Sequence, residues 1–110
     1  MTPDWPALRV SIREAVHNLE SEWYQVARVA GTSRLFDLIA WKNKKILFLV
    51  IRSARKAKID LFPEELTALS AGIKTGTIPG DVQLWIRQHA GWAKWQIFSG
   101  GAQLIHREGA

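Results

Sequence analysis

Apolar residues recur at helical spacing near the start of the chain. Leu8, Ile12, Ala15 and Leu19 are three or four positions apart. This spacing predicts an amphipathic helix over about residues 4–20, with one face packed against the rest of the fold.

The next three segments have the length and composition of strands. Residues 23–29 (WYQVARV) and 35–41 (LFDLIAW) are separated by the turn AGTSR, and the turn KNKK leads into residues 46–52 (ILFLVIR). Residues 46–52 are apolar at odd and even positions alike. Because successive side chains point to opposite faces, we expect this strand to be covered on both sides, in the middle of a sheet.

The second half of the chain predicts one more helix and a hairpin. Residues 62–72 (FPEELTALSAG) carry a proline and two glutamates at the start, which favours a helix. Residues 82–88 (VQLWIRQ) alternate cleanly, and residues 92–98 (WAKWQIF) return after a turn as their hairpin partner. The tail SGGAQLIHREGA is expected to add one short strand.

The resulting order is α-β-β-β-α-β-β, which predicts an α/β fold with a mixed central sheet flanked by helices. A crossover through the 62–72 helix should place the fourth strand parallel to the third. The alternating segment 82–88 could also be an edge strand that is available for self-association. One domain over residues 1–110 is expected from the length.

Composition narrows the class of protein. Hydrophobic residues make up 47% of the 110 residues, which is typical of a folded domain, and there is no cysteine. No apolar run is long enough to span a membrane, and the N-terminus has no signal-peptide pattern. We expect a soluble, cytoplasmic protein with no membrane partner.

The charge is concentrated in one segment. The net charge is +5, and residues 38–59 contain seven basic side chains and no acid. These are Lys42, Lys44, Lys45, Arg52, Arg55, Lys56 and Lys58. Such a segment is typical of a protein that binds a polyanion, and it is equally compatible with a solvated face.

The stretch AGTSRLFDLIA, with ILFLVIR after it, resembles a known pattern. It is similar to the PD-(D/E)XK nuclease superfamily, and within it to the archaeal Holliday junction resolvases, over about residues 5–98. In that family DLIA carries a metal-binding aspartate, here Asp37, and the third strand ends in E-x-K. The resemblance implies a restriction-endonuclease-like core, a nucleic-acid partner, branched or duplex DNA, and a homodimer.

The E-x-K pair is absent from this chain. Val50 stands thirteen residues after Asp37, at the place of the family's glutamate, and Arg52 stands at the place of its lysine. Mg²⁺ requires oxygen ligands, which valine lacks, and arginine stays protonated where a lysine could assist proton transfer. Arginine remains a good clamp for phosphate. We therefore expect a catalytically impaired site that holds metal at Asp37 weakly or not at all, with an Asp37–Arg52 ion pair in its place.

An active Mg²⁺-dependent endonuclease remains an alternative. Resolvase-like enzymes add a glutamate from the first helix, and Glu14 lies near that position. The helical angle places Glu14 far from the apolar stripe, so a solvated side chain is the simpler interpretation. In the active alternative, Asp37, Glu14 and the backbone carbonyl near Ile51 would hold the ion.

Other polar and aromatic residues allow more than one interpretation. Ser33 and Thr32 could donate to a phosphate, although turn chemistry explains them equally well. His17, His89 and His106 have no ligand spacing, and no phosphate-binding glycine motif occurs. Trp41, Trp85, Trp92 and Trp95 could stack on bases, but tryptophans on alternating strands are more often core or interface residues. This leaves a third hypothesis, a nuclease-derived module that binds another protein through a Trp-rich surface.

Overall fold

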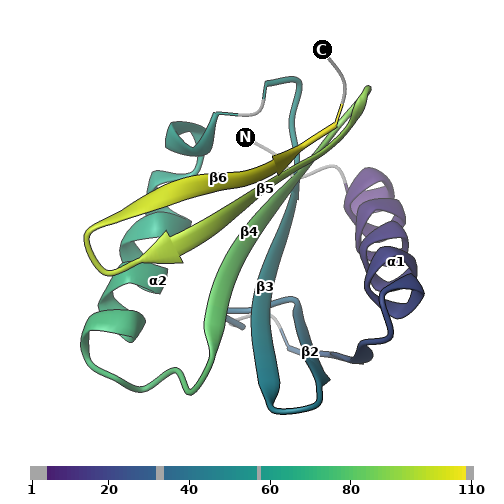
Figure 1. The fold of residues 1–110 in the computed structure, drawn as a ribbon. Helices are drawn as coiled ribbons and strands as arrows, with labels where there is room; N and C mark the ends of the chain where they lie inside the picture. Colours follow the sequence, from purple (N-terminus) through teal and green to yellow (C-terminus); the bar gives the residue numbers. More distant parts are fainter. Residues whose placement is uncertain (1–4, 32–33, 57, 109–110) are drawn as a thin grey trace.

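The computed structural model describes residues 5–31, 34–56 and 58–108, which form one six-stranded sheet between two helices (Figure 1). The helices are α1 (Trp5–Ser21) and α2 (Pro63–Lys74), with a short 3₁₀ turn, η1 (Ile59–Leu61), before α2. The strands are β1 (Gln25–Arg28), β2 (Leu38–Lys42), β3 (Lys45–Ser53), β4 (Asp81–Gln88), β5 (Gly91–Phe98) and β6 (Gly101–Arg107). The predicted order is confirmed, with β6 as the strand expected in the tail.

The strands lie in the sheet in the order in which they occur in the chain. All neighbours are antiparallel except β3 and β4, which run parallel from the Leu47–Asp81 pair to the Ser53–Arg87 pair. The predicted parallel pairing is confirmed. The predicted hairpin of residues 82–88 with residues 92–98 is confirmed, and the alternative of an edge strand is wrong, because β4 is hydrogen-bonded to β3 on one side and to β5 on the other. The edges are β1 and β6.

The two faces of β3 belong to two separate cores. Leu49 and Ile51 pack in the core that contains Leu19 of α1. Val50 packs in the other core, which contains Leu69 of α2. The doubly apolar pattern of this strand therefore reflects burial on both sides, as expected.

The first strand is shorter than predicted, because the turn after α1 reaches further along the chain. Trp23 has a φ of +72°, and the backbone N–H groups of Trp23 and Tyr24 donate to Glu20 and Leu19. The left-handed conformation ends the helix and leaves the Trp23 side chain 86% exposed. Trp23 is therefore part of a helix-terminating turn, and the strand begins at Gln25.

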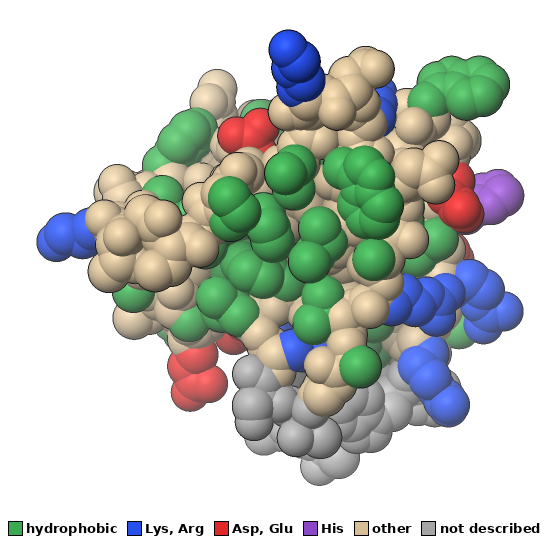
Figure 2. Space-filling view, turned by 90° about the horizontal axis from the view of Figure 1, so that it is seen from below, with side chains coloured by type: hydrophobic (Ala, Val, Ile, Leu, Met, Phe, Trp, Pro, Cys, Tyr) green, Lys and Arg blue, Asp and Glu red, His purple; other side chains and the backbone are tan. Residues whose placement is uncertain are grey.

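A hydrophobic surface remains open next to α2. Trp41 of β2 and Ile46 of β3 are directly paired and are 42% and 38% exposed. The next pair on this face is Ile39 with Phe48, both half-buried. Seen from below, the molecule shows hydrophobic side chains gathered over one area (Figure 2). We call the side chains of these two pairs the β2–β3 apolar surface: Trp41, Ile46, Ile39 and Phe48.

Neither described helix is long and apolar enough to cross a membrane.

Candidate functional site

Asp37 lies just before β2 and is almost completely buried, at 6% exposure. Its Oδ1 accepts a hydrogen bond from Arg34 Nε at 3.0 Å. Its Oδ2 accepts from Arg52 Nη1 at 3.1 Å and from the backbone N–H of Ile51 at 2.8 Å. The Asp37–Arg52 pair expected from the sequence is present, and Arg34 is a second cation that the sequence analysis missed.

Arg52 connects this carboxylate to α2. Its Nε donates to Glu65 Oε2 at 2.9 Å, and its Nη1 also donates to the carbonyl oxygen of Ile51 at 2.7 Å. Arg34, Asp37, Arg52 and Glu65 thus form a chain of alternating charges, which we call the Asp37 network. It links the approach to β2, the end of β3 and the first turn of α2, and its carboxylates are balanced by cations of the same chain.

Val50 is a buried core residue of β3. Its side chain lies on the same face of β3 as that of Arg52, because the two are two residues apart in a strand. Val50 is 1% exposed and packs with Leu84 and Ile86 in the core next to α2. A hydrocarbon side chain in this position supplies packing energy and no oxygen ligand.

The residues present do not fit a magnesium ion. Mg²⁺ is normally held by more than one oxygen ligand from protein or substrate, in near-octahedral order. Here each of the two oxygens of Asp37 already accepts from a guanidinium, and Glu65, the other acid of the network, is paired with Arg52. Across residues 5–31, 34–56 and 58–108, no group of three or more His, Cys, Asp or Glu side chains could hold a metal.

Glu14 contacts a different part of the sheet. Its carboxylate accepts a hydrogen bond from Nε of Arg87 on β4, and that guanidinium lies 5.6 Å from the ring centre of Trp92. The side chains of α1 that line the small pocket at Asp37 are Arg9 and Ile12. The structure therefore pairs Glu14 with Arg87 and does not bring it into contact with Asp37.

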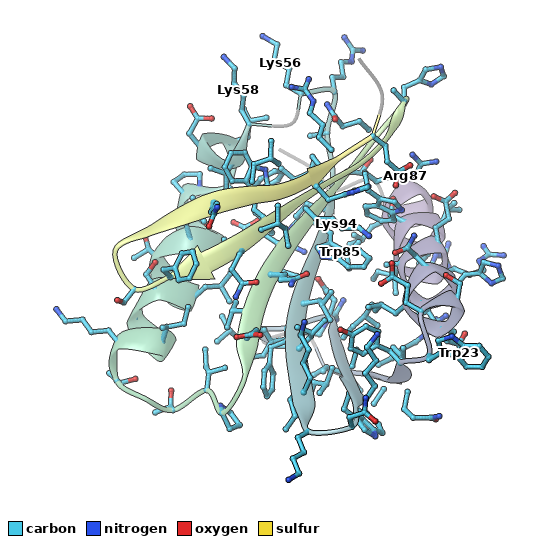
Figure 3. The ribbon with its side chains drawn as sticks, viewed as in Figure 1. Trp23, Lys56, Lys58, Trp85, Arg87 and Lys94 are labelled. Atoms are coloured by element: carbon cyan, nitrogen blue, oxygen red, sulfur yellow. The ribbon has the colours of Figure 1, made fainter. Side chains whose placement is uncertain are left out.

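The basic segment divides into two groups at opposite ends of β3. Lys44 and Lys45 are exposed at the β2–β3 hairpin, while Lys42 turns toward α1 and donates to the carbonyl oxygen of Glu22 at 2.9 Å. Arg55, Lys56 and Lys58 follow the other end of the strand. A nine-residue strand is about 27 Å long, so these two groups do not form one surface. Figure 3 shows Lys56 and Lys58 at the end opposite the hairpin.

The second basic group borders a groove. Arg55, Lys56 and Lys58 are joined by Arg107 of β6 around a space of about 500 Å³. Trp95 of β5 and Leu104 of β6 also line it. We call this the Trp95 groove. Ser33 and Thr32 lie outside the residues that the structure describes.

The tryptophans divide between core and surface. Trp85 and Trp92 are 2% and 5% exposed, with ring centres 5.5 Å apart, and they are core residues as expected. Trp95 is half-buried at the groove, and Trp41 is on the β2–β3 apolar surface. Burial therefore excludes Trp85 and Trp92 from stacking on an unpaired base, whereas Trp95 and Trp41 are at least partly accessible.

Lys94 is a buried cation beneath α1. Its Nζ donates to Oδ1 of Asn18 at 2.8 Å and lies 4.0 Å from the ring centre of Trp85. Burial lowers the pKa of Lys94 below its ordinary value of 10.5, against the opposing charges of Glu22 and Glu108. This hydrogen bond connects α1 to β5, and its strength depends on the protonation state of Lys94 (Figure 3).

Comparison with known proteins identifies one fold. No family model matches the sequence, and no curated protein matches it. The structure is similar to that of Hjc, a Holliday junction resolvase from the archaeal hyperthermophile Archaeoglobus fulgidus. The two chains are 16% identical, the match covers 80% of this chain and 70% of Hjc, and the TM-score is 0.56. The restriction-endonuclease-like fold predicted from the sequence is confirmed.

Proposed function

We propose that this protein is a nuclease-fold nucleic-acid-binding protein whose cleavage site has been converted into a structural ion-pair network. The observation that carries this proposal is the environment of Asp37. Both of its oxygens accept hydrogen bonds from arginines of the same chain, and Val50, on the face of β3 that Arg52 shares, is a buried core residue without a ligand atom. A divalent cation there would have to displace two guanidiniums and would gain one carboxylate.

The proposed partner is branched or duplex DNA, bound through phosphate contacts. The likeness to a Holliday junction resolvase supports this class of partner, as do the exposed cations that follow β3. Lysine and arginine contacts to phosphates give affinity without sequence preference. We further propose that residues 1–110 act as one domain and that the protein is a homodimer, as its resemblance to the resolvases implies.

Incubation with labelled four-way junction, duplex and single-stranded DNA, with and without Mg²⁺ or Mn²⁺, tests this proposal. We expect retarded complexes on gels and no cleavage products under any metal condition. Metal-dependent nicking that is lost in Asp37→Ala and in Glu14→Gln would instead support the active endonuclease. Sedimentation velocity tests the homodimer, which should have twice the 12.4 kDa mass of the chain.

A second candidate function is that of a protein-interaction module. The observation that favours it is the β2–β3 apolar surface, where the paired side chains Trp41 and Ile46 are both more than one third exposed. Contiguous exposed apolar area of this kind is typical of interaction sites. If no DNA complex forms even at low ionic strength, the basic groups are merely solvated and this second function takes precedence.

A further inference from the structure

The Trp95 groove shares no lining residue with the Asp37 network. It lies between the segment after β3, η1 and the β5–β6 hairpin, and its volume of about 500 Å³ falls within the range of small-ligand sites. Its cations come from distant parts of the chain. Arg55, Lys56 and Lys58 precede α2, whereas Arg107 is at the end of β6.

The cations of the groove differ in their ion pairing from those of the Asp37 network. Within the part of the chain that the structure describes, none of Arg55, Lys56, Lys58 and Arg107 forms an ion pair. All four are exposed, and Asp60 is the acid among the residues that line the groove. The groove therefore carries an excess of positive charge, which favours an anionic ligand.

The groove also has an apolar floor. Trp95 of β5 is paired in the sheet with Leu104 of β6, and both side chains line the groove. Trp95 is half-buried, and Leu104 is 39% exposed. The ladder between β5 and β6 shifts its register at Lys94/Trp95, next to this pair. Such irregularities re-aim side chains, and here the irregularity accompanies an indole that faces a basic groove.

The combination of an indole floor and four cations matches a nucleotide that is not base-paired. An aromatic side chain can stack on the face of a base, and every base offers such a face. In a continuous duplex these faces are covered by the neighbouring base pairs. A ligand that uses both the cations and the floor must therefore present a phosphate chain together with a free base.

We propose that the Trp95 groove binds an unpaired nucleotide of a nucleic-acid strand. The base lies against Trp95 and Leu104, and the flanking phosphates are bound by Arg55, Lys56, Lys58 and Arg107. This inference rests on the proposed function and specifies its substrate class. Nucleic acids with single-stranded or unpaired segments are bound in preference to continuous duplex.

Fluorescence anisotropy with four ligands tests the inference on the unmodified protein. These are a labelled twelve-nucleotide oligothymidine, the same length of strand with abasic sugars, a twelve-base-pair duplex and, as competitor, thymidine monophosphate. We expect the oligothymidine to bind at least about fivefold more tightly than the abasic strand, because stacking on an aromatic side chain contributes an effect of that order per base. The mononucleotide should compete weakly, since it lacks flanking phosphates.

Variants locate the site. Trp95→Leu should weaken oligothymidine binding at least about fivefold while duplex binding changes less than about twofold. Trp23→Leu is the control, because Trp23 is an exposed tryptophan on the turn after α1, far from Lys56 and Lys58 (Figure 3), and it should leave both affinities unchanged. Thermal unfolding of each variant shows whether it is folded. If Trp95→Leu does not fold, Lys56→Gln with Lys58→Gln, at two exposed positions, should weaken oligothymidine binding at least about fivefold.

The possible outcomes separate this inference from the proposed function. Equal affinity for the thymidine and abasic strands overturns the inference, since the site would then bind phosphates alone. Mononucleotide binding as tight as that of the strand also overturns it, because the ligand would then be a free nucleotide. In both of those cases retained duplex binding leaves the proposed function intact. If nothing binds, both fail.

Discussion

Nη1 of Arg52 lies 3.1 Å from Oδ2 of Asp37, and Nε of the same guanidinium lies 2.9 Å from Oε2 of Glu65. One guanidinium therefore bridges two carboxylates from different elements, and Arg34 supplies the second positive charge of the network. Arg52 and Arg34 together supply the counter-charges of the buried aspartate.

Replacing Arg52 with alanine should destabilise the protein by about 2 kcal/mol, because a buried carboxylate loses one of its two cations. Urea unfolding followed by circular dichroism measures this change. Arg55→Ala is the control and should leave the midpoint nearly unchanged, since Arg55 is exposed and forms no ion pair with any described residue. Equal effects of the two substitutions would contradict a structural role for the network.

Val50→Glu with Arg52→Lys should restore metal binding, because the pair of substitutions recreates the E-x-K pattern beside Asp37. We expect this double variant to unfold at a lower temperature than the wild type without metal, since a carboxylate replaces a buried valine. Mn²⁺ should raise its unfolding temperature and release heat in calorimetry. Val50→Gln with Arg52→Lys is the control, because it lacks only the carboxylate at position 50. A flat calorimetric titration of the V50E/R52K variant would refute the assignment of position 50.

The stability contributed by Lys94 should depend on pH. Its folded-state pKa is lowered by burial, while the unfolded chain keeps the ordinary value of 10.5. Between these two values the unfolded chain binds more protons, so stability rises with pH in that window and is lower below it. The unfolding temperature of the wild type relative to Lys94→Met should therefore increase as pH approaches 10.5. The control variant Lys74→Met, at the exposed end of α2, should show the same dependence of unfolding temperature on pH as the wild type.

The two basic groups at the ends of β3 should contribute unequally to duplex DNA binding. Lys56→Glu with Lys58→Glu should weaken binding more than about tenfold and reduce the slope of log affinity against log salt by about 2, because two phosphate contacts are lost. Lys44→Glu with Lys45→Glu, at the hairpin, introduces the same charge change and should have less than about a twofold effect. Gel-shift titrations at several salt concentrations make this comparison, and identical losses would show that both ends bind DNA.

Much of the fold could be predicted from the sequence because its main signals are local. The apolar residues at odd and even positions of β3 required cover on both sides, and the helix after it set β4 parallel. The alternative of an edge strand for β4 failed because alternation describes which face a side chain takes and not how many neighbours a strand has. The regular alternation of β4 occurs in a strand that is buried over most of its length.

The site was predicted in part. The Asp37–Arg52 contact followed from charge balance, and an arginine three residues before Asp37 was a local signal that pointed to Arg34. Other contacts left no sequence signal. Glu14 and Arg87 are 73 positions apart, and the groove that joins Trp95 to Arg107 depends on a register shift between β5 and β6.

The single parallel pairing also determines how the chain can assemble. β1, β2 and β3 form one run of antiparallel neighbours, and β4, β5 and β6 form another. Each run is closed by connections shorter than the segment 54–80, which must be looped before β3 and β4 can meet. Loop-closure entropy makes such a non-local seam slow to form. The sheet therefore consists of two antiparallel halves, β1–β3 and β4–β6. The rate of folding should depend on how fast the parallel pairing between β3 and β4 forms.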